Sequence, residues 1–129
     1  MNNNKILCID DDPFYADLFR AILEPKGFQV SSAMNPADGW TVIQANKPDL
    51  ITLDVMMPEK EGFFDGYGLL KKLRGDAAYK ALPVIMISAL GDPEDVKHGM
   101  DAGATSYMPK QEMTPDTLVA LIKKLLGQK

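Results

Sequence analysis

The sequence predicts an α/β fold in which five strands form a parallel sheet with helices on both faces. Short apolar stretches alternate with amphipathic helical segments, which is typical of right-handed crossover connections. The apolar stretches are continuous rather than alternating, as expected for strands covered on both faces. Four helix starts are marked by a capping residue followed by proline: Asp12-Pro13, Asn35-Pro36, Asp92-Pro93 and Thr114-Pro115.

Each expected strand comes before an expected helix. The strands are Lys5–Ile9, Gln29–Ala33, Leu50–Leu53, Val84–Ile87 and Ser106–Met108. Four helices begin at the capped prolines, and the remaining helix contains Leu69–Arg74 after a loop. Gly27 and Gly127 are expected to close the first and last helices. One apolar face is predicted in the last helix, formed by Leu118, Leu121, Ile122 and Leu125.

Length and composition predict one small domain, residues 1–129. The net charge of −4 argues against direct binding of nucleic acid, which favours a basic face. The N-terminus has no apolar signal-peptide region, and no apolar run approaches the roughly 20 residues that span a membrane. The single cysteine, Cys8, fits a reducing compartment. We therefore expect a cytoplasmic protein without a membrane partner.

Polar residues follow four of the five expected strands. Asp10 and Asp11 follow the first, Asp54 the third and Ser88 the fourth, and Lys110 lies just after the fifth. Taken alone, each has an ordinary interpretation as a solvated strand end or a loop residue. However, the carboxyl ends of strands in an open α/β sheet form its binding site. Three carboxylates suit a hard divalent cation, whereas an ammonium and a hydroxyl suit phosphate oxygens. The pattern predicts metal-assisted phosphoryl transfer with a carboxylate as acceptor.

Four short motifs carry a resemblance to a known family. They are Ile9-Asp10-Asp11, Leu53-Asp54-Val55-Met56-Met57-Pro58, Met86-Ile87-Ser88-Ala89, and an aromatic, Tyr107, three residues before Lys110. As a set they resemble the response-regulator receiver domain, the CheY-like family of two-component signalling. The resemblance runs from Lys5 to about Leu126. It implies a flavodoxin-like (βα)5 fold with strand order 2-1-3-4-5.

The resemblance also implies a role for each site residue. Asp54 would be the phosphoacceptor, and Lys110 and Ser88 would bind phosphoryl oxygens. Tyr107 would be the switch aromatic that follows Ser88. Magnesium, or manganese in its place, would be held by Asp11, by Asp54, by the backbone carbonyl of Met56 and, through a water molecule, by Asp10.

Partners follow from the same resemblance. The phosphoryl group would come from a histidine kinase or a phosphotransfer protein, and the output would be a downstream protein target or a fused output domain. The chain would catalyse its own phosphorylation and slow dephosphorylation without being a turnover enzyme. A stand-alone protein or a phosphorelay intermediate is expected. The signalling face, which could also form a homodimer, would comprise the helix after Pro93, the strand 106–108 and the helix after Pro115.

The chain departs from the family pattern at three places. The family usually has proline after the active-site lysine, whereas Gln111 follows Lys110 here, so we predict a trans bond and a reshaped loop. The loop 59–68 is long, and Glu61-Gly62 and Asp65-Gly66 compete for the position of the family's Asp-Gly pair. Met56 and Leu90 are apolar where the family tunes phosphoryl lifetime, which suggests slow self-dephosphorylation.

Three other functions compete with this interpretation. A pseudo-receiver, acting as a phosphorylation-independent interaction module, is the main alternative. An aspartyl-phosphate hydrolase typically carries a second aspartate two residues after the nucleophile, where this chain has Met56. A flavodoxin-like electron carrier would need a phosphate-binding loop after the first strand, and Asp10-Asp11-Asp12 has the opposite charge.

Overall fold

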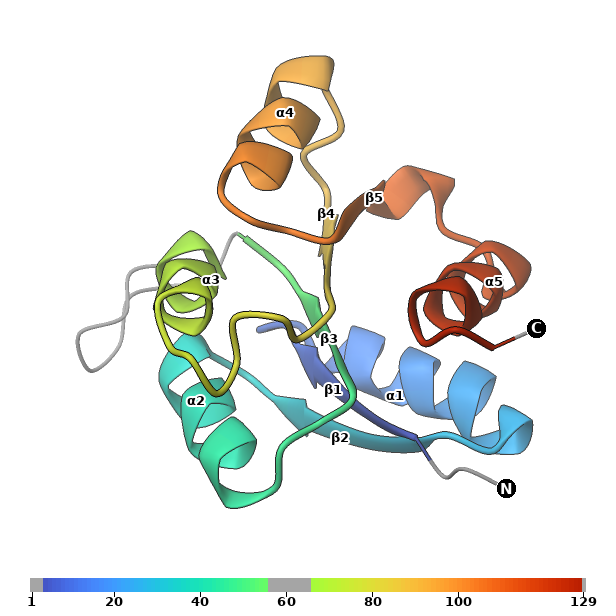
Figure 1. Ribbon diagram of the computed structural model, residues 1–129. Helices are drawn as coiled ribbons and strands as arrows, with labels where there is room; N and C mark the ends of the chain where they lie inside the picture. The colour runs from blue at the N-terminus through green and yellow to red at the C-terminus, as the bar shows by residue number, and fades with distance from the viewer. Residues whose placement is uncertain (1–3, 56–65, 129) are drawn as a thin grey trace.

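A computed structural model of the chain describes residues 4–55 and 66–128. Five parallel strands form one sheet in the order β2-β1-β3-β4-β5, which confirms the predicted order (Figure 1). The strands are β1 (Lys5–Ile9), β2 (Gln29–Ala33), β3 (Leu50–Leu53), β4 (Val84–Ser88) and β5 (Ser106–Pro109). The fourth and fifth strands each run one residue further than predicted, because Ser88 and Pro109 are paired in the ladder.

The helices are α1 (Pro13–Leu23), α2 (Pro36–Ala45), α3 (Gly66–Arg74), α4 (Pro93–Asp101) and α5 (Pro115–Leu125), with short 3₁₀ turns η1 (Glu24–Lys26) and η2 (Lys110–Glu112). The predicted caps are present. Asp12, for example, accepts a hydrogen bond from the Phe14 N–H. Gly27 (φ 94°) closes η1 rather than α1 itself, because a 3₁₀ turn extends that helix. The helix predicted around Leu69–Arg74 starts earlier, at Gly66.

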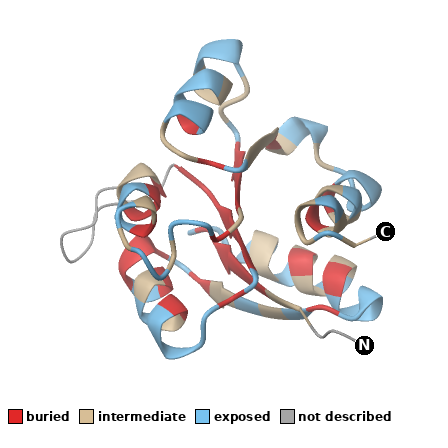
Figure 2. Cartoon of the chain, in the orientation of Figure 1, coloured by how far each residue is buried: buried red, intermediate tan, exposed pale blue. Residues whose placement is uncertain are grey.

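The core consists of two layers, one on each face of the sheet. On one face, α1 and α5 contribute Phe19, Leu23, Leu118 and Ile122; on the other, α2 and α3 contribute Ile43, Leu69, Leu70 and Leu73. Every residue of β3 and β4 is buried, whereas the edge strands β2 and β5 are partly exposed (Figure 2). The apolar strands β1, β3 and β4 therefore have both faces covered, as predicted. The prediction is wrong for β2, an edge strand in which Gln29 and Ser31 are exposed. In the described part of the chain, no helix has the length and apolarity needed to cross a membrane.

Arg74, at the end of α3, joins three segments at the amino end of the sheet. Its Nε donates to the Gly103 carbonyl at 2.8 Å, and its Nη1 donates to the Leu82 carbonyl at 2.8 Å. We expect Arg74→Lys to lower the free energy of unfolding by about 2 kcal/mol, because the single nitrogen of an ammonium cannot reach both carbonyls, whereas the guanidinium uses Nε for one and Nη1 for the other. Urea denaturation would measure this. Lys71→Arg on the exposed face of the same helix is the control, and an equal effect of both changes would contradict the prediction.

Candidate functional site

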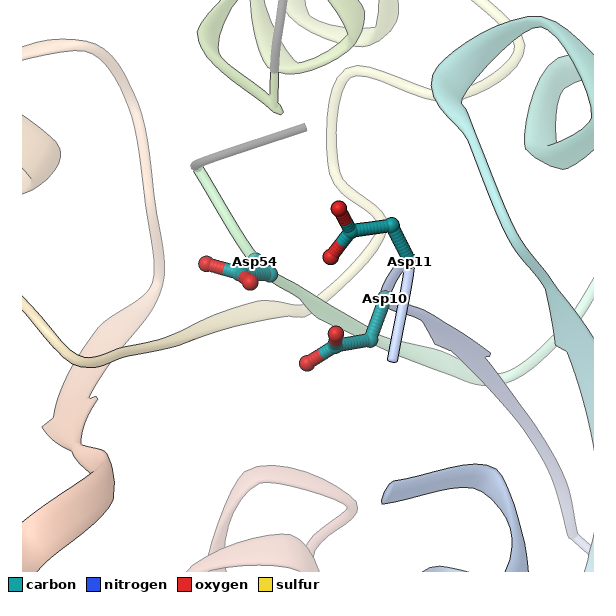
Figure 3. A group of neighbouring side chains, drawn as sticks. All are labelled: Asp10, Asp11 and Asp54. Carbon is teal, nitrogen blue, oxygen red and sulfur yellow. The ribbon is translucent and has the colours of Figure 1, made fainter. Parts of the chain in front are cut away.

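The strand register brings three carboxylates together at the carboxyl edge of the sheet. Ile9 of β1 lies beside Leu53 of β3, so the next residues, Asp10 and Asp54, leave neighbouring strands at the same level. Asp11 follows Asp10, and Figure 3 shows all three side chains at these two strand ends. One oxygen from each carboxylate lies within 4.8 Å of the others. Asp10 and Asp54 are buried, while Asp11 is exposed.

Lys110 lies between the two buried carboxylates. Its Nζ is 3.0 Å from Asp10 Oδ2 and 3.3 Å from Asp54 Oδ2. Burial raises the pKa of Asp10, and the hydrogen bonds from the Asp12 N–H and from Lys110 offset this only in part. Burial lowers the pKa of Lys110, but the hydrogen bond to Asp10 and the charges of both carboxylates outweigh it and raise that pKa. The ammonium therefore remains protonated and offsets part of the negative charge of the cluster.

The loop that carries Lys110 has the trans peptide bond that the sequence predicted. The Lys110–Gln111 bond is trans, and Lys110 begins the 3₁₀ turn η2 directly after β5. The Gln111 side chain lies against Gly91 in the loop after β4, where an added Cβ would be 2.2 Å from Gln111 Nε2. The nitrogen of Lys110 also lies over the ring of Tyr15, 3.9 Å from its centroid. Lys110 therefore contacts the carboxylates of Asp10 and Asp54 even though no proline follows it.

Ser88 and Tyr107 both bind Leu90, two residues after the end of β4. Ser88 is fully buried, and its Oγ accepts from the Leu90 N–H at 3.2 Å. The Tyr107 hydroxyl donates to the Leu90 carbonyl at 2.6 Å, and burial raises the pKa of this phenol. The Tyr107 ring lies against Gly99 of α4, where a Cβ would be 2.6 Å from the ring. The loop from Ser88 is therefore tied to β5 and α4 through one tyrosine.

Gly66 packs directly against the backbone that carries Asp54. Its N–H donates to the Val55 carbonyl at 3.2 Å, and an added Cβ would lie 2.3 Å from the Asp54 carbonyl oxygen. The glycine of Asp65-Gly66 therefore starts α3 beside the site, whereas the competing pair Glu61-Gly62 lies outside the described residues. Met56, whose carbonyl was predicted to bind the metal, and the segment 59–65 of the long loop also lie outside them.

Comparisons with known proteins identify the family. The model of the response regulator receiver domain matches residues 6–123. This chain belongs to the response-regulator receiver family. It is 35% identical over 125 residues to response regulator Rre1 of Synechocystis sp., covering 96% of this chain and 52% of Rre1. The chain thus spans about half the length of that relative.

Solved receiver structures have the same fold. The receiver domain of a signal transduction histidine kinase from Syntrophus aciditrophicus matches with a TM-score of 0.84 and 33% identity, over 96% of this chain and 90% of that one. A CheY-like receiver domain protein from Methanospirillum hungatei matches with a TM-score of 0.85 and 27% identity, over 98% of this chain and 95% of that one. The flavodoxin-like α/β fold expected from the resemblance is therefore confirmed.

The donor set fits a divalent cation of the magnesium type. Asp10, Asp11 and Asp54 offer only carboxylate oxygens, which are the ligands that hard cations prefer. The exposed Asp11 leaves the cluster open on one side, and magnesium usually keeps several waters. No cysteine or histidine belongs to this cluster of described residues, so softer metals have no favoured ligand in it.

Proposed function

We propose that the chain is a single receiver domain, with a core from about 5 to 126, that accepts a phosphoryl group on Asp54. The observation that carries the proposal is the buried Asp54 carboxylate with the Lys110 ammonium 3.3 Å away. A pseudo-receiver would have no need to keep a buried acceptor, a lysine and two further carboxylates at one strand edge. Magnesium, held by Asp10, Asp11 and Asp54, would supply positive charge toward the phosphoryl oxygens.

In the proposed reaction, an Asp54 oxygen attacks the phosphorus of a phosphohistidine on a kinase or phosphotransfer protein. A phosphorus–oxygen bond forms as the phosphorus–nitrogen bond breaks, and the imidazole nitrogen takes the bonding electron pair and later a proton. Lys110 binds one phosphoryl oxygen, and Ser88 binds another by turning away from the Leu90 N–H. The loop from Ser88 to Leu90 would then change its contact with Tyr107, which transmits the signal to α4 and β5.

Intact-mass analysis after incubation with magnesium and acetyl phosphate tests this function. We expect one added phosphoryl group on the wild type and none on Asp54→Asn, because the amide is a poor nucleophile. Asp17→Asn, which changes an exposed carboxylate of α1, is the matched control and should react like the wild type. An unmodified wild type, or an equally modified Asp54→Asn, would overturn the proposal.

A further inference from the structure

Tyr15 contacts the proposed phosphoryl-binding lysine from a different element of the fold. Its ring comes from the first turn of α1, which begins directly after the acidic cluster, and the Lys110 nitrogen lies over it at 3.9 Å from the centroid. This distance is well within the roughly 6 Å at which a cation is attracted to an aromatic face. The contact therefore links α1 to the residue that follows β5.

The three contacts of the Lys110 nitrogen differ in kind. Asp10 and Asp54 each accept through an oxygen, at 3.0 and 3.3 Å, whereas Tyr15 offers the face of a ring. A ring face attracts the positive charge, but it is a weaker hydrogen-bond acceptor than a carboxylate oxygen. The ammonium is thus held in place without being fully occupied by strong acceptors, which leaves it able to bind a phosphoryl oxygen.

Neighbouring aromatic rings fix the orientation of Tyr15. Phe19, only 2% exposed, packs edge-on against it at 6.2 Å between centroids, and Phe14 does so at 5.2 Å from the solvent side. Both neighbours belong to α1, whose start is fixed by the Asp12 cap. The helix that follows the acidic cluster therefore also sets the position of the ring.

We propose that Tyr15 is a positioning residue for Lys110, whose ring face holds the ammonium between Asp10 and Asp54 where a phosphoryl oxygen binds. The inference rests on the proposed function for its consequence in phosphorylation, but the contact itself can be tested without it. A long lysine side chain has many rotamers, and a partner that restricts them lowers the entropy lost when the oxygen is bound.

Two substitutions of Tyr15 separate the effect of its aromatic face on Lys110 from the effect of apolar packing. Tyr15→Leu keeps an apolar side chain but removes the ring, whereas Tyr15→Phe keeps the ring and removes the hydroxyl. In the protein without added metal, NMR should show the Lys110 ε-methylene shifted by the ring current in the wild type and in Tyr15→Phe. This shift should be lost in Tyr15→Leu, and its retention there would overturn the inference.

The second experiment measures the rate of phosphorylation by acetyl phosphate with magnesium. We expect Tyr15→Leu to react about fivefold more slowly and Tyr15→Phe to react within about twofold of the wild type. In a Lys110→Met background, Tyr15→Leu should cause no further loss, because the two residues act through one contact. An equal loss in both backgrounds would assign Tyr15 to the fold alone and overturn the inference.

The NMR experiment and the rate experiment distinguish the proposed receiver function from the positioning role of Tyr15. A wild type that is never phosphorylated overturns the proposed function, while the NMR shift still decides whether Tyr15 holds Lys110. A wild type that is phosphorylated at a rate unaffected by Tyr15→Leu retains the function and overturns the positioning role.

Discussion

Gly66→Ala is expected to lower the free energy of unfolding by about 2 kcal/mol, within the range for an overpacked core site, and to slow phosphorylation of Asp54. The new Cβ would lie 2.3 Å from the Asp54 carbonyl oxygen and 2.8 Å from the Val55 Cα. Both are backbone atoms of the segment that leaves β3, so no side chain can rotate to make room. Either α3 or the segment directly after β3 must shift, and that segment carries Asp54, the proposed acceptor.

Gly75→Ala is the control for this prediction. A Cβ at Gly75 would lie 3.4 Å from the nearest atom, the Lys71 carbonyl oxygen, and the residue is exposed. We expect urea denaturation to give a free energy of unfolding close to that of the wild type, and the phosphorylation rate should be unchanged. If Gly66→Ala behaved like Gly75→Ala in both measurements, the close packing of α3 against the Asp54 backbone would carry no functional constraint.

The fold was predictable because its signals are local. Apolar runs, amphipathic periodicity and four capped prolines each depend on residues within one segment, and together they imply a parallel sheet with covered faces. The order of the strands in the sheet could not be predicted from such local signals. The alternation of strands and helices is compatible with several orders, and here the order came from the resemblance to a family.

The candidate site was partly predictable for a topological reason. A residue that ends a parallel strand must lie at the carboxyl edge, so the sequence already grouped Asp10, Asp54 and Lys110. Tyr15 gave no such signal, because an aromatic residue in the first turn of a helix usually only packs in the core or lies on the surface. Gly66 was left in competition with Gly62, since both follow an acidic residue in one loop. In both cases the deciding information is a contact between different elements, of Tyr15 in α1 with Lys110 after β5 and of Gly66 in α3 with the backbone after β3.

Lys110→Met is expected to lower the free energy of unfolding by about 3 kcal/mol in the absence of divalent cations. The substitution keeps much of the apolar stem but leaves two buried carboxylates, Asp10 and Asp54, without their shared cation. A buried charge that loses its partner is costly, because water cannot replace the lost interaction. Urea denaturation in a chelating buffer would measure the loss.

Lys97→Met supplies the matched control. Lys97 also pairs with an aspartate, Asp101, at 2.9 Å, but both side chains are largely exposed. An exposed pair of this kind contributes at most about 1 kcal/mol, so the same substitution should cost far less there. Equal losses in the two variants would show that the carboxylate cluster is screened by solvent in spite of its burial.

Magnesium should stabilise the Lys110→Met and Lys97→Met variants to different extents. A bound cation would supply the positive charge that Lys110→Met removes, so magnesium should stabilise this variant more than the wild type, and Lys97→Met only as much as the wild type. The double variant Asp10→Asn/Lys110→Met removes one carboxylate together with the lysine. It should lose less stability than Lys110→Met alone, because one fewer buried carboxylate charge is left without the lysine. A Lys110→Met protein that gained no more stability from magnesium than the wild type would contradict the expectation that a cation at Asp10, Asp11 and Asp54 replaces the charge of Lys110.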